Sequence, residues 1–216
     1  MRVLDRRAVV GLLLASAAAG LEAGCAAGPG LTAQAQAGPD PVYARTEVAY
    51  VTRERPGTVV IDPDNHFLYL VQANGRATRY GVGVGGEGYG WSGEATVHNK
   101  QEWPDWYPTK QYLAEHPKVA QFLKPLPSGE GVRGGPQSPM GARALYLWQG
   151  QKDTLYRIHG TNEPWTIGTS VSAGCIRMTN PDVMDLYERV PVGTKVVVLP
   201  SRGVPQALVV PEPRRG

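Results

Sequence analysis

One cysteine and one histidine in the C-terminal part of the chain carry the clearest signs of chemistry. Cys175 stands in the hexapeptide SAGCIR (172–177), and His159 precedes a glycine at the expected end of a strand. A thiol has a pKa of about 8.5 and becomes a nucleophile when a base removes its proton. The two residues are 16 positions apart, so only the fold can join them. We expect Cys175 to be the nucleophile and His159 the general base.

The residues next to this pair have expected roles in supporting the reaction. The amide N–H groups of Gly174 and Cys175 can face the oxyanion of a tetrahedral intermediate. A backbone carbonyl such as that of Gly160 can orient the imidazole, so no third side chain is required. Ser172 is expected to hold the loop through a hydroxyl hydrogen bond.

Two arginines lie close to the pair in sequence. Arg177 either pairs with a carboxylate such as Asp182 or Asp185, or clamps a substrate carboxylate and stabilises the thiolate. Arg157 shares a strand face with His159 by alternation and is expected to reach the cleft.

Composition favours a single, mainly β domain and excludes some partners. The 216 residues are 42% hydrophobic and 19% charged, which is enough for one core. The 27 glycines and 19 prolines favour short strands and turns. A formal charge of +3, without a Lys/Arg-rich run in the folded part, argues against a nucleic-acid partner.

The N-terminus has the pattern of an export signal. Arg6 and Arg7 lie in a basic head, which is followed by an uncharged apolar stretch at 8–21. That stretch is too short for a comfortable permanent membrane anchor, so no transmembrane span is expected in the mature protein. The arginine pair fits a twin-arginine route loosely. Cys25 is expected to leave with the signal, although a lipid anchor there is the alternative.

Removal of residues 1–37 would leave Cys175 as a single thiol in an oxidising compartment. Structural cysteines of exported proteins usually come in pairs. A buried inert thiol is the structural alternative; the surrounding sequence favours a reactive one.

Short β-branched and apolar runs predict most of the elements that must position these residues. Strands are predicted at 58–62, 66–73, 76–84, 95–100, 142–148, 154–158 and 194–199. Asn74-Gly75 predicts a hairpin turn, and Pro181 lies in the first turn of one main helix at about 179–190. The expected organisation is an export signal, a linker, one domain and a loose tail, at 1–37, 38–57, 58–200 and 201–216.

Two further segments border the predicted strands. A glycine-dense run at 81–90 lacks the G-K-[ST] ending of a phosphate loop and is expected to be a flexible turn or cleft edge. Residues 103–140 are expected to form a long irregular loop, of a kind that is often functional. Trp106 in this loop either lines a substrate cleft or packs beneath the loop. The scattered histidines have no metal-ligand spacing, so neither a metal nor a cofactor is expected.

The chain resembles the catalytic domain of the L,D-transpeptidases. The resemblance is carried by HGTNEPWTIG (159–168), SAGCIRM (172–178), NPDVMDLY (180–187) and VGTKVVV (192–198). It extends upstream to HFLYLVQANGRATRYGVGVG (66–85), WPDWYP (103–108) and PMGARALYLW (139–148). It therefore covers roughly residues 57–200.

The resemblance implies a β-sandwich-like domain whose cysteine attacks peptidoglycan stem peptides. The donor would be a tetrapeptide stem, cut between its diamino acid and the terminal D-alanine. The acyl group would pass to an amine of another stem, to a lipoprotein lysine or to water. The family is also acylated by carbapenems. Cys175 matches the nucleophile and His159 the base, whereas Ala173 replaces a histidine that many members carry.

Other classes of protein remain open at this point. A non-catalytic wall-binding domain would keep the same fold without turnover, and an L,D-carboxypeptidase would use water as the acceptor. A thiol redox protein is disfavoured, because the chain has no C-x-x-C pair. The presence of both Cys175 and His159 favours an enzyme over a non-catalytic domain. The export signal implies the periplasm or cell envelope, and the resemblance implies a role in cell-wall organisation and cell shape.

Overall fold

A computed structural model describes residues 38–87 and 89–201. The expected export signal with Cys25, and the tail beyond Ser201, lie outside these residues. Among the described residues, no helix is long and apolar enough to cross a membrane.

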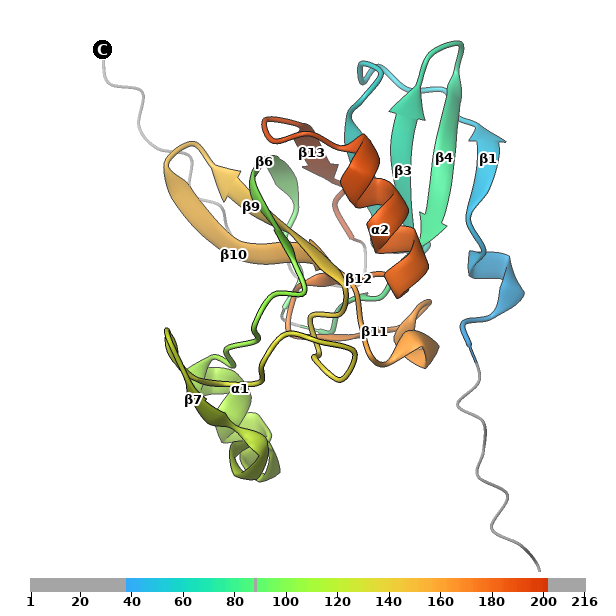
Figure 1. The fold of residues 1–216 in the computed structure, drawn as a ribbon. Helices are drawn as coiled ribbons and strands as arrows, with labels where there is room; N and C mark the ends of the chain where they lie inside the picture. The colour runs from blue at the N-terminus through green and yellow to red at the C-terminus, as the bar shows by residue number, and fades with distance from the viewer. Residues whose placement is uncertain (1–37, 88, 202–216) are drawn as a thin grey trace, which may run out of the picture. The chain divides into compact units, whose positions relative to one another are not determined.

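Nine strands form one mixed sheet in the order β1-β4-β3-β2-β13-β6-β9-β10-β12 (Figure 1). Its strands are β1 (Thr46–Ala49), β2 (Val59–Asp62), β3 (Phe67–Gln72), β4 (Arg76–Gly81), β6 (Gly93–Glu102), β9 (Arg143–Gln149), β10 (Lys152–His159), β12 (Ile176–Arg177) and β13 (Lys195–Val198). Only the β2–β13 and β10–β12 pairs within this sheet are parallel. Short strands β5 (Val84–Gly85) and β11 (Ser170–Ser172) form a separate parallel pair.

The β3–β4 hairpin turns where the sequence predicted it. Three residues, 73–75, connect the last cross-strand pair, Gln72 with Arg76. Asn74 and Gly75 in this turn both have positive φ, 59° and 66°, which these two residue types tolerate. Val71 and Ala77 are cross-strand partners just before and after that turn and are almost completely buried. The local turn residues and the alternating apolar side chains therefore specify the same register.

Helix α2 (Asn180–Arg189) covers part of the core. Thr179 caps its N-terminus by accepting a hydrogen bond from the Asp182 amide, and Pro181 occupies its first turn. Val183 and Leu186 are fully buried in a core cluster that also contains residues of β2, β3, β6, β9 and β13. The prediction of a mainly β domain with one main helix is confirmed.

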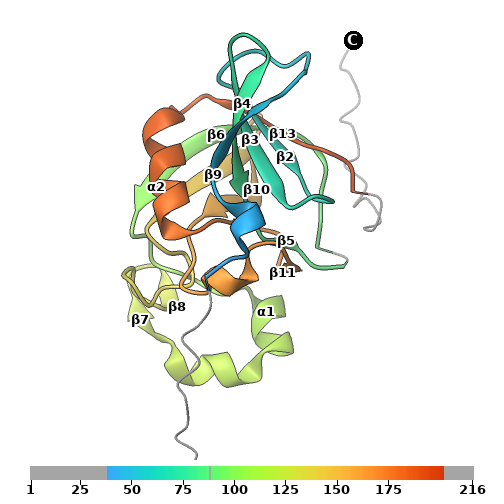
Figure 2. The same cartoon turned by 90° about the vertical axis from the view of Figure 1, so that its right-hand side faces the viewer.

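Residues 103–140 are more ordered than the expected irregular loop. They contain α1 (Lys110–Glu115), the 3-10 helix η2 (Pro117–Phe122) and the hairpin of β7 (Lys124–Leu126) with β8 (Gly129–Gly131). These elements lie together at one end of the described domain (Figure 2). The Tyr89 hydroxyl donates to Glu115 and accepts from Gln111 at 3.0 Å, which ties α1 to the glycine-dense run.

The expected linker at 38–57 also contains regular structure. A short 3-10 helix, η1 (Pro41–Tyr43), precedes β1, which pairs with β4 along four residues. The linker prediction was wrong for this strand, because its mixed polar sequence resembles a loop while its backbone completes the edge of the sheet. A further 3-10 helix, η3 (Pro164–Thr166), lies between β10 and β11.

Candidate active site

Strands β10 and β12 bring the histidine and the cysteine to one face of the sheet. Ile158 pairs with Ile176 and His159 pairs with Arg177, in parallel register. The two isoleucines point into the core, where each is at most 3% exposed. Alternation puts His159 on the opposite face, and Cys175, directly before β12, lies on that face too. The two side chains are therefore on neighbouring chain segments, two positions apart in register.

His159 is held as a neutral imidazole. It is 5% exposed, and its Nδ1 lies 2.5 Å from the Gly160 carbonyl oxygen. Since a carbonyl only accepts, Nδ1 carries the proton, which leaves Nε2 as the basic nitrogen. Burial, assisted by the charge of Arg177, lowers the pKa of His159 to about 4, against the opposing effect of backbone carbonyls. The ring is therefore uncharged at neutral pH and can accept a proton.

Cys175 is a partly exposed free thiol. Its Sγ donates a weak hydrogen bond to the Leu155 carbonyl oxygen at 3.9 Å. Burial raises the pKa of the Cys175 thiol, while the Arg157 amide and the charges of Arg157 and Arg177 act in the opposite direction. The resting pair is therefore a thiol and a neutral imidazole, rather than a thiolate and an imidazolium.

A bulge in β10 shapes the surroundings of the sulfur. The β9–β10 register shifts between Asp153 and Arg157, and Leu155 adopts a positive φ of 63°. Asp153 stabilises this bend by accepting from the Leu155 amide at 2.8 Å and from Arg157 at 2.7 and 2.8 Å. The bulge thus presents the Leu155 carbonyl and the Arg157 amide to the thiol. Leucine rarely adopts this conformation, so the sequence contained no signal for it.

The hydroxyl of Ser172 holds the loop before Cys175 through two hydrogen bonds to its backbone. Its hydroxyl donates to the Cys175 carbonyl at 2.6 Å and accepts from the Gly174 amide at 3.2 Å. Gly174 has a φ of 109°, and a Cβ there would lie 2.4 Å from the Tyr156 ring. From the sequence, both the Gly174 N–H and the Cys175 N–H are expected to face the oxyanion. In the structure the Gly174 N–H donates to Ser172, whereas the Cys175 N–H has no partner among the described residues.

The arginine contacts differ from those expected. Arg177 pairs with Glu163 at 2.8 Å, and not with either aspartate of α2. Those two aspartates instead contact Arg45, at 3.8 Å (Asp182) and 2.9 Å (Asp185). Glu163 directly precedes η3 and is 14 positions before Arg177 in the sequence. The sequence spacing therefore could not identify it as the partner of Arg177.

Arg157 and Trp106 both pack against neighbouring rings. The Arg157 guanidinium lies 4.4 Å from the centre of the Tyr146 ring, in addition to its ion pair with Asp153. Trp106 packs edge-on against Tyr112 of α1, with ring centres 5.4 Å apart. Tyr112 and the β-bridge partner of Trp106, Val132, both belong to the 103–140 segment.

Replacing Arg157 with glutamine is expected to make the thiol less reactive. The change removes a positive charge that lowers the pKa of Cys175, so a smaller fraction of the sulfur is thiolate at a given pH. Alkylation by iodoacetamide at pH 8 should slow by roughly three- to tenfold. Arg157→Lys keeps the charge and should recover most of the rate. An unchanged rate in Arg157→Gln would show that this charge does not act on the sulfur.

Among the described residues, no group of three or more His, Cys, Asp or Glu side chains is arranged to hold a metal ion. The site described above is built from one thiol, one imidazole and backbone groups.

Comparison with known sequences places these residues in a characterised domain. The sequence model described as the L,D-transpeptidase catalytic domain (YkuD) matches residues 56–198. The probable L,D-transpeptidase ErfK/SrfK of Escherichia coli K12 is 36% identical over 149 residues, which are 67% of this chain and 44% of that protein. The probable L,D-transpeptidase YbiS of the same strain is 35% identical over 144 residues, or 65% and 43% of the two chains. The chain spans less than half the length of these relatives.

Solved structures give weaker spatial matches. A Brucella melitensis protein, described as a probable carnitine operon oxidoreductase caia, is 51% identical and has a TM-score of 0.49, covering 74% of this chain and 96% of that one. An L,D-transpeptidase from Mycobacterium smegmatis is 17% identical, with a TM-score of 0.47 and coverage of 66% and 58%. Both scores are below 0.5, so the sequence comparisons carry the assignment.

Proposed function

Because the chain belongs to the L,D-transpeptidase catalytic domain family, we propose that it is an exported cysteine acyltransferase acting on peptidoglycan stem peptides. The observation that carries this proposal is the β10–β12 register, which puts Cys175 and a neutral His159 on one face of adjacent segments. A nucleophile on the same face of the sheet as a base that is unprotonated at neutral pH suits acyl transfer. The hydrogen bond of the Cys175 sulfur goes to the Leu155 carbonyl, so the proton transfer requires the thiol to turn toward His159.

The first half-reaction forms a thioester with the donor. The Cys175 sulfur attacks the carbonyl carbon between the diamino acid and the terminal D-alanine of a tetrapeptide stem, while His159 Nε2 takes the thiol proton. The tetrahedral intermediate collapses as the carbon–nitrogen bond breaks. The protonated His159 returns its proton to the nitrogen of the leaving D-alanine, so the ring is neutral again.

The second half-reaction transfers the acyl group to an acceptor amine. His159 removes a proton from the amine as its nitrogen attacks the thioester carbonyl. The carbon–sulfur bond then breaks, and the thiolate recovers the proton. The raised pKa of Cys175 and the lowered pKa of His159 support a mechanism in which proton transfer accompanies sulfur attack, rather than one that begins from a preformed ion pair.

The backbone of the cysteine loop would stabilise the oxyanion. The Cys175 N–H has no partner among the described residues and could donate to the oxyanion, whereas the Gly174 N–H already donates to the Ser172 hydroxyl. Removing one such donor from an acyltransferase typically costs a hundredfold or more. Gly160 would keep the imidazole oriented through its carbonyl.

The arginines and Trp106 have proposed roles in substrate binding. Arg177 would clamp a substrate carboxylate, which would take the place of the carboxylate of Glu163, a side chain that is 44% exposed. Arg157 would act close to the sulfur, and Trp106 would border the path of the stem from the 103–140 segment. Ala173 would leave the site without the histidine that the family resemblance implies at this position in many members.

The proposed place of action is the periplasm or cell envelope, after removal of residues 1–37. A lipid anchor at Cys25 is the alternative route to the same compartment. The proposed organisation retains one catalytic domain at about 58–200, followed by a tail from residue 201. The acceptor would be a stem-peptide amine, with a lipoprotein lysine as the alternative.

Incubation with a purified stem tetrapeptide and a stem tripeptide tests the proposed reaction. Mass spectrometry should detect loss of D-alanine from the donor and a new crosslinked product. Donor converted only to tripeptide would identify water as the acceptor and make the enzyme an L,D-carboxypeptidase. An intact donor, with the protein shown to be folded, would contradict catalysis and favour a non-catalytic wall-binding domain.

A further inference from the structure

A cavity of about 420 Å³ lies behind the loop that carries the thiol. Gly174 and Ile176 line this cavity, whereas Cys175 between them does not. Ile176 belongs to the core face of β12, opposite the face assigned above to Cys175. The cavity is therefore separate from the face that carries the thiol, and the segment 174–176 forms the wall between them.

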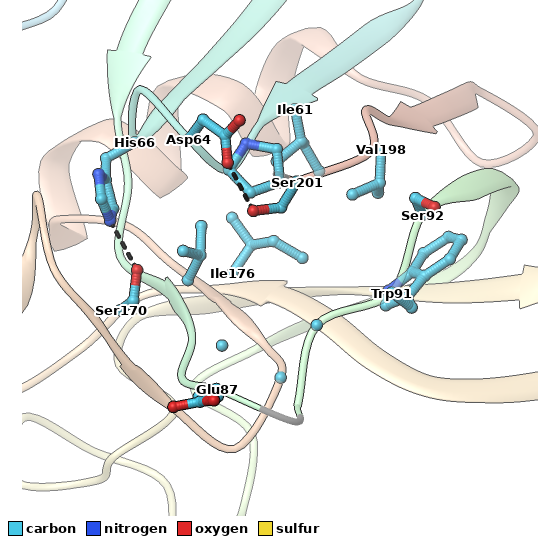
Figure 3. A pocket seen from close by; sticks show the side chains of 15 residues that line it. Ile61, Asp64, His66, Glu87, Trp91, Ser92, Ser170, Ile176, Val198 and Ser201 are labelled. Carbon is cyan, nitrogen blue, oxygen red and sulfur yellow. Dashed lines mark hydrogen bonds between the residues drawn. The ribbon is translucent and has the colours of Figure 1, made fainter. Parts of the chain in front are cut away.

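The cavity has an apolar floor between two polar walls. The floor is formed by core side chains that reach it from β2, β5, β12 and β13, namely Ile61, Val84, Ile176 and Val198. Figure 3 shows His66 and Ser170, joined by a 2.9 Å hydrogen bond, on one side, and Trp91 with Ser92 on the other. This construction suits a ligand with a short aliphatic part and polar ends.

Trp91 supplies an unused hydrogen-bond donor to this cavity. The residue is 8% exposed, and its buried Nε1 has no hydrogen-bond partner among the described residues. Buried indole N–H groups normally have an acceptor, because leaving one unpaired is unfavourable. A ligand carbonyl oxygen in the cavity would satisfy it.

The charge of the cavity is negative. Asp64 and Glu87 are the charged side chains among its lining residues, and neither lysine nor arginine is among them. Asp64 accepts a hydrogen bond from Ser201 at 2.5 Å, and Glu87 is exposed at the rim. Burial lowers the pKa of His66, against the effects of Asp62 and Asp64, so this ring does not offset the carboxylates at neutral pH.

We propose that the cavity binds the side chain of a basic amino acid in peptide linkage, as a site distinct from the thiol. The aliphatic stem would lie on Ile176 and Val198, a carbonyl oxygen would accept from Trp91 Nε1, and the ammonium would face the carboxylate of Glu87. The same chemistry is present in the diamino acid of a stem peptide and in a protein lysine. Only the first of these sources depends on the proposed function.

Calorimetric titration with Nα-acetyl-lysine methylamide tests the proposal without requiring turnover. The norleucine counterpart keeps the stem and carbonyls but lacks the ammonium, and it should bind at least about fivefold more weakly. Trp91→Phe keeps an aromatic wall and removes the N–H, and Glu87→Gln removes one charge; each should weaken binding severalfold. Trp165→Phe and Glu130→Gln are matched controls outside the cavity and should bind like the unaltered protein.

Several outcomes would overturn the proposal. These are absence of binding, equal binding of the norleucine compound, or unaltered affinity in both Trp91→Phe and Glu87→Gln. Loss of probe binding after a carbapenem has acylated Cys175 would place the probe in the reaction groove and also overturn it. If Trp91→Phe does not fold, Glu87→Gln decides alone, because its side chain is exposed.

A second titration distinguishes the two sources of the ligand. It compares a stem tetrapeptide with the lysine compound, using the Cys175→Ala protein so that no donor is consumed. Tighter binding of the stem that is weakened by Glu87→Gln assigns the cavity to the cell wall, and tighter binding of the lysine compound that is weakened by the same change assigns it to a protein partner. Because binding is measured, a failure of catalysis would leave this result intact.

Discussion

Replacing Cys175 with alanine is expected to abolish both acyl transfer and the covalent carbapenem adduct. No second thiol lies among the described residues, so within them the variant has no thiol to form a thioester. Loss of a nucleophile that acts together with a general base typically lowers turnover by at least about 10⁴-fold. Intact-protein mass spectrometry should show one carbapenem per unaltered chain and none on the variant.

Cys175→Ser is the matched control for shape at this position. It preserves the size of the side chain and the loop held by Ser172, but its hydroxyl is a much weaker nucleophile next to an imidazole with a pKa of about 4. Both variants should unfold at temperatures close to that of the unaltered protein. An adduct that persists on Cys175→Ala would identify a different nucleophile, and no adduct on the folded unaltered protein would favour a non-catalytic domain.

The parts of the fold that could be predicted are those with a local physical cause. Asn74-Gly75 allowed the hairpin to be predicted, because both residues tolerate the positive φ that the turn requires. Pro181 likewise predicted the start of α2, since a proline in the first turn suits a helix N-terminus. These signals operate within a few residues of chain and need no knowledge of the tertiary structure.

The site geometry depends on contacts that the sequence does not encode locally. His159 and Cys175 could be paired only by chemical reasoning and the family resemblance, because their proximity arises from the parallel β10–β12 pairing. The bulge at Leu155 could not be predicted, because Asp153 and Arg157 stabilise a backbone conformation that leucine disfavours. The hydrogen bond from the Gly174 amide to the Ser172 hydroxyl also depends on the folded loop, so the sequence could not predict it.

In the 103–140 segment, the sequence led to a prediction of too little regular structure. Its prolines and glycines indicated an irregular loop, yet α1 forms behind an N-cap at Thr109, and the Tyr89 hydroxyl ties it to the glycine-dense run. Six residues of helix have little stability alone, so tertiary contacts must hold it.

Replacing His159 with glutamine is expected to lower turnover by roughly 10²- to 10⁴-fold, the usual contribution of a general base. Glutamine can still donate to the Gly160 carbonyl but cannot accept a proton from Cys175. The effect should be on turnover more than on donor binding, because the imidazole acts on the moving proton. Stem-tetrapeptide kinetics measure both, and His98→Gln, at an exposed ring stacked on Trp148, is the matched control. Turnover within threefold of the unaltered protein would exclude His159 as the base.

The same substitution should also flatten the dependence of stability on pH, which gives a readout independent of catalysis. His159 has a pKa of about 4 in the folded protein and an ordinary value of 6.5, so the unfolded chain binds its proton first as the pH falls. The lowered pKa therefore has no effect on the free energy of unfolding above pH 6.5. Below pH 6.5 the free energy of unfolding decreases, by on the order of 3 kcal/mol at pH 4. Urea unfolding across this window should show that decrease in the unaltered protein and a smaller one in His159→Gln. Equal slopes would mean that the pKa of His159 in the folded protein is close to its ordinary value of 6.5, which would contradict the neutral, buried imidazole described above.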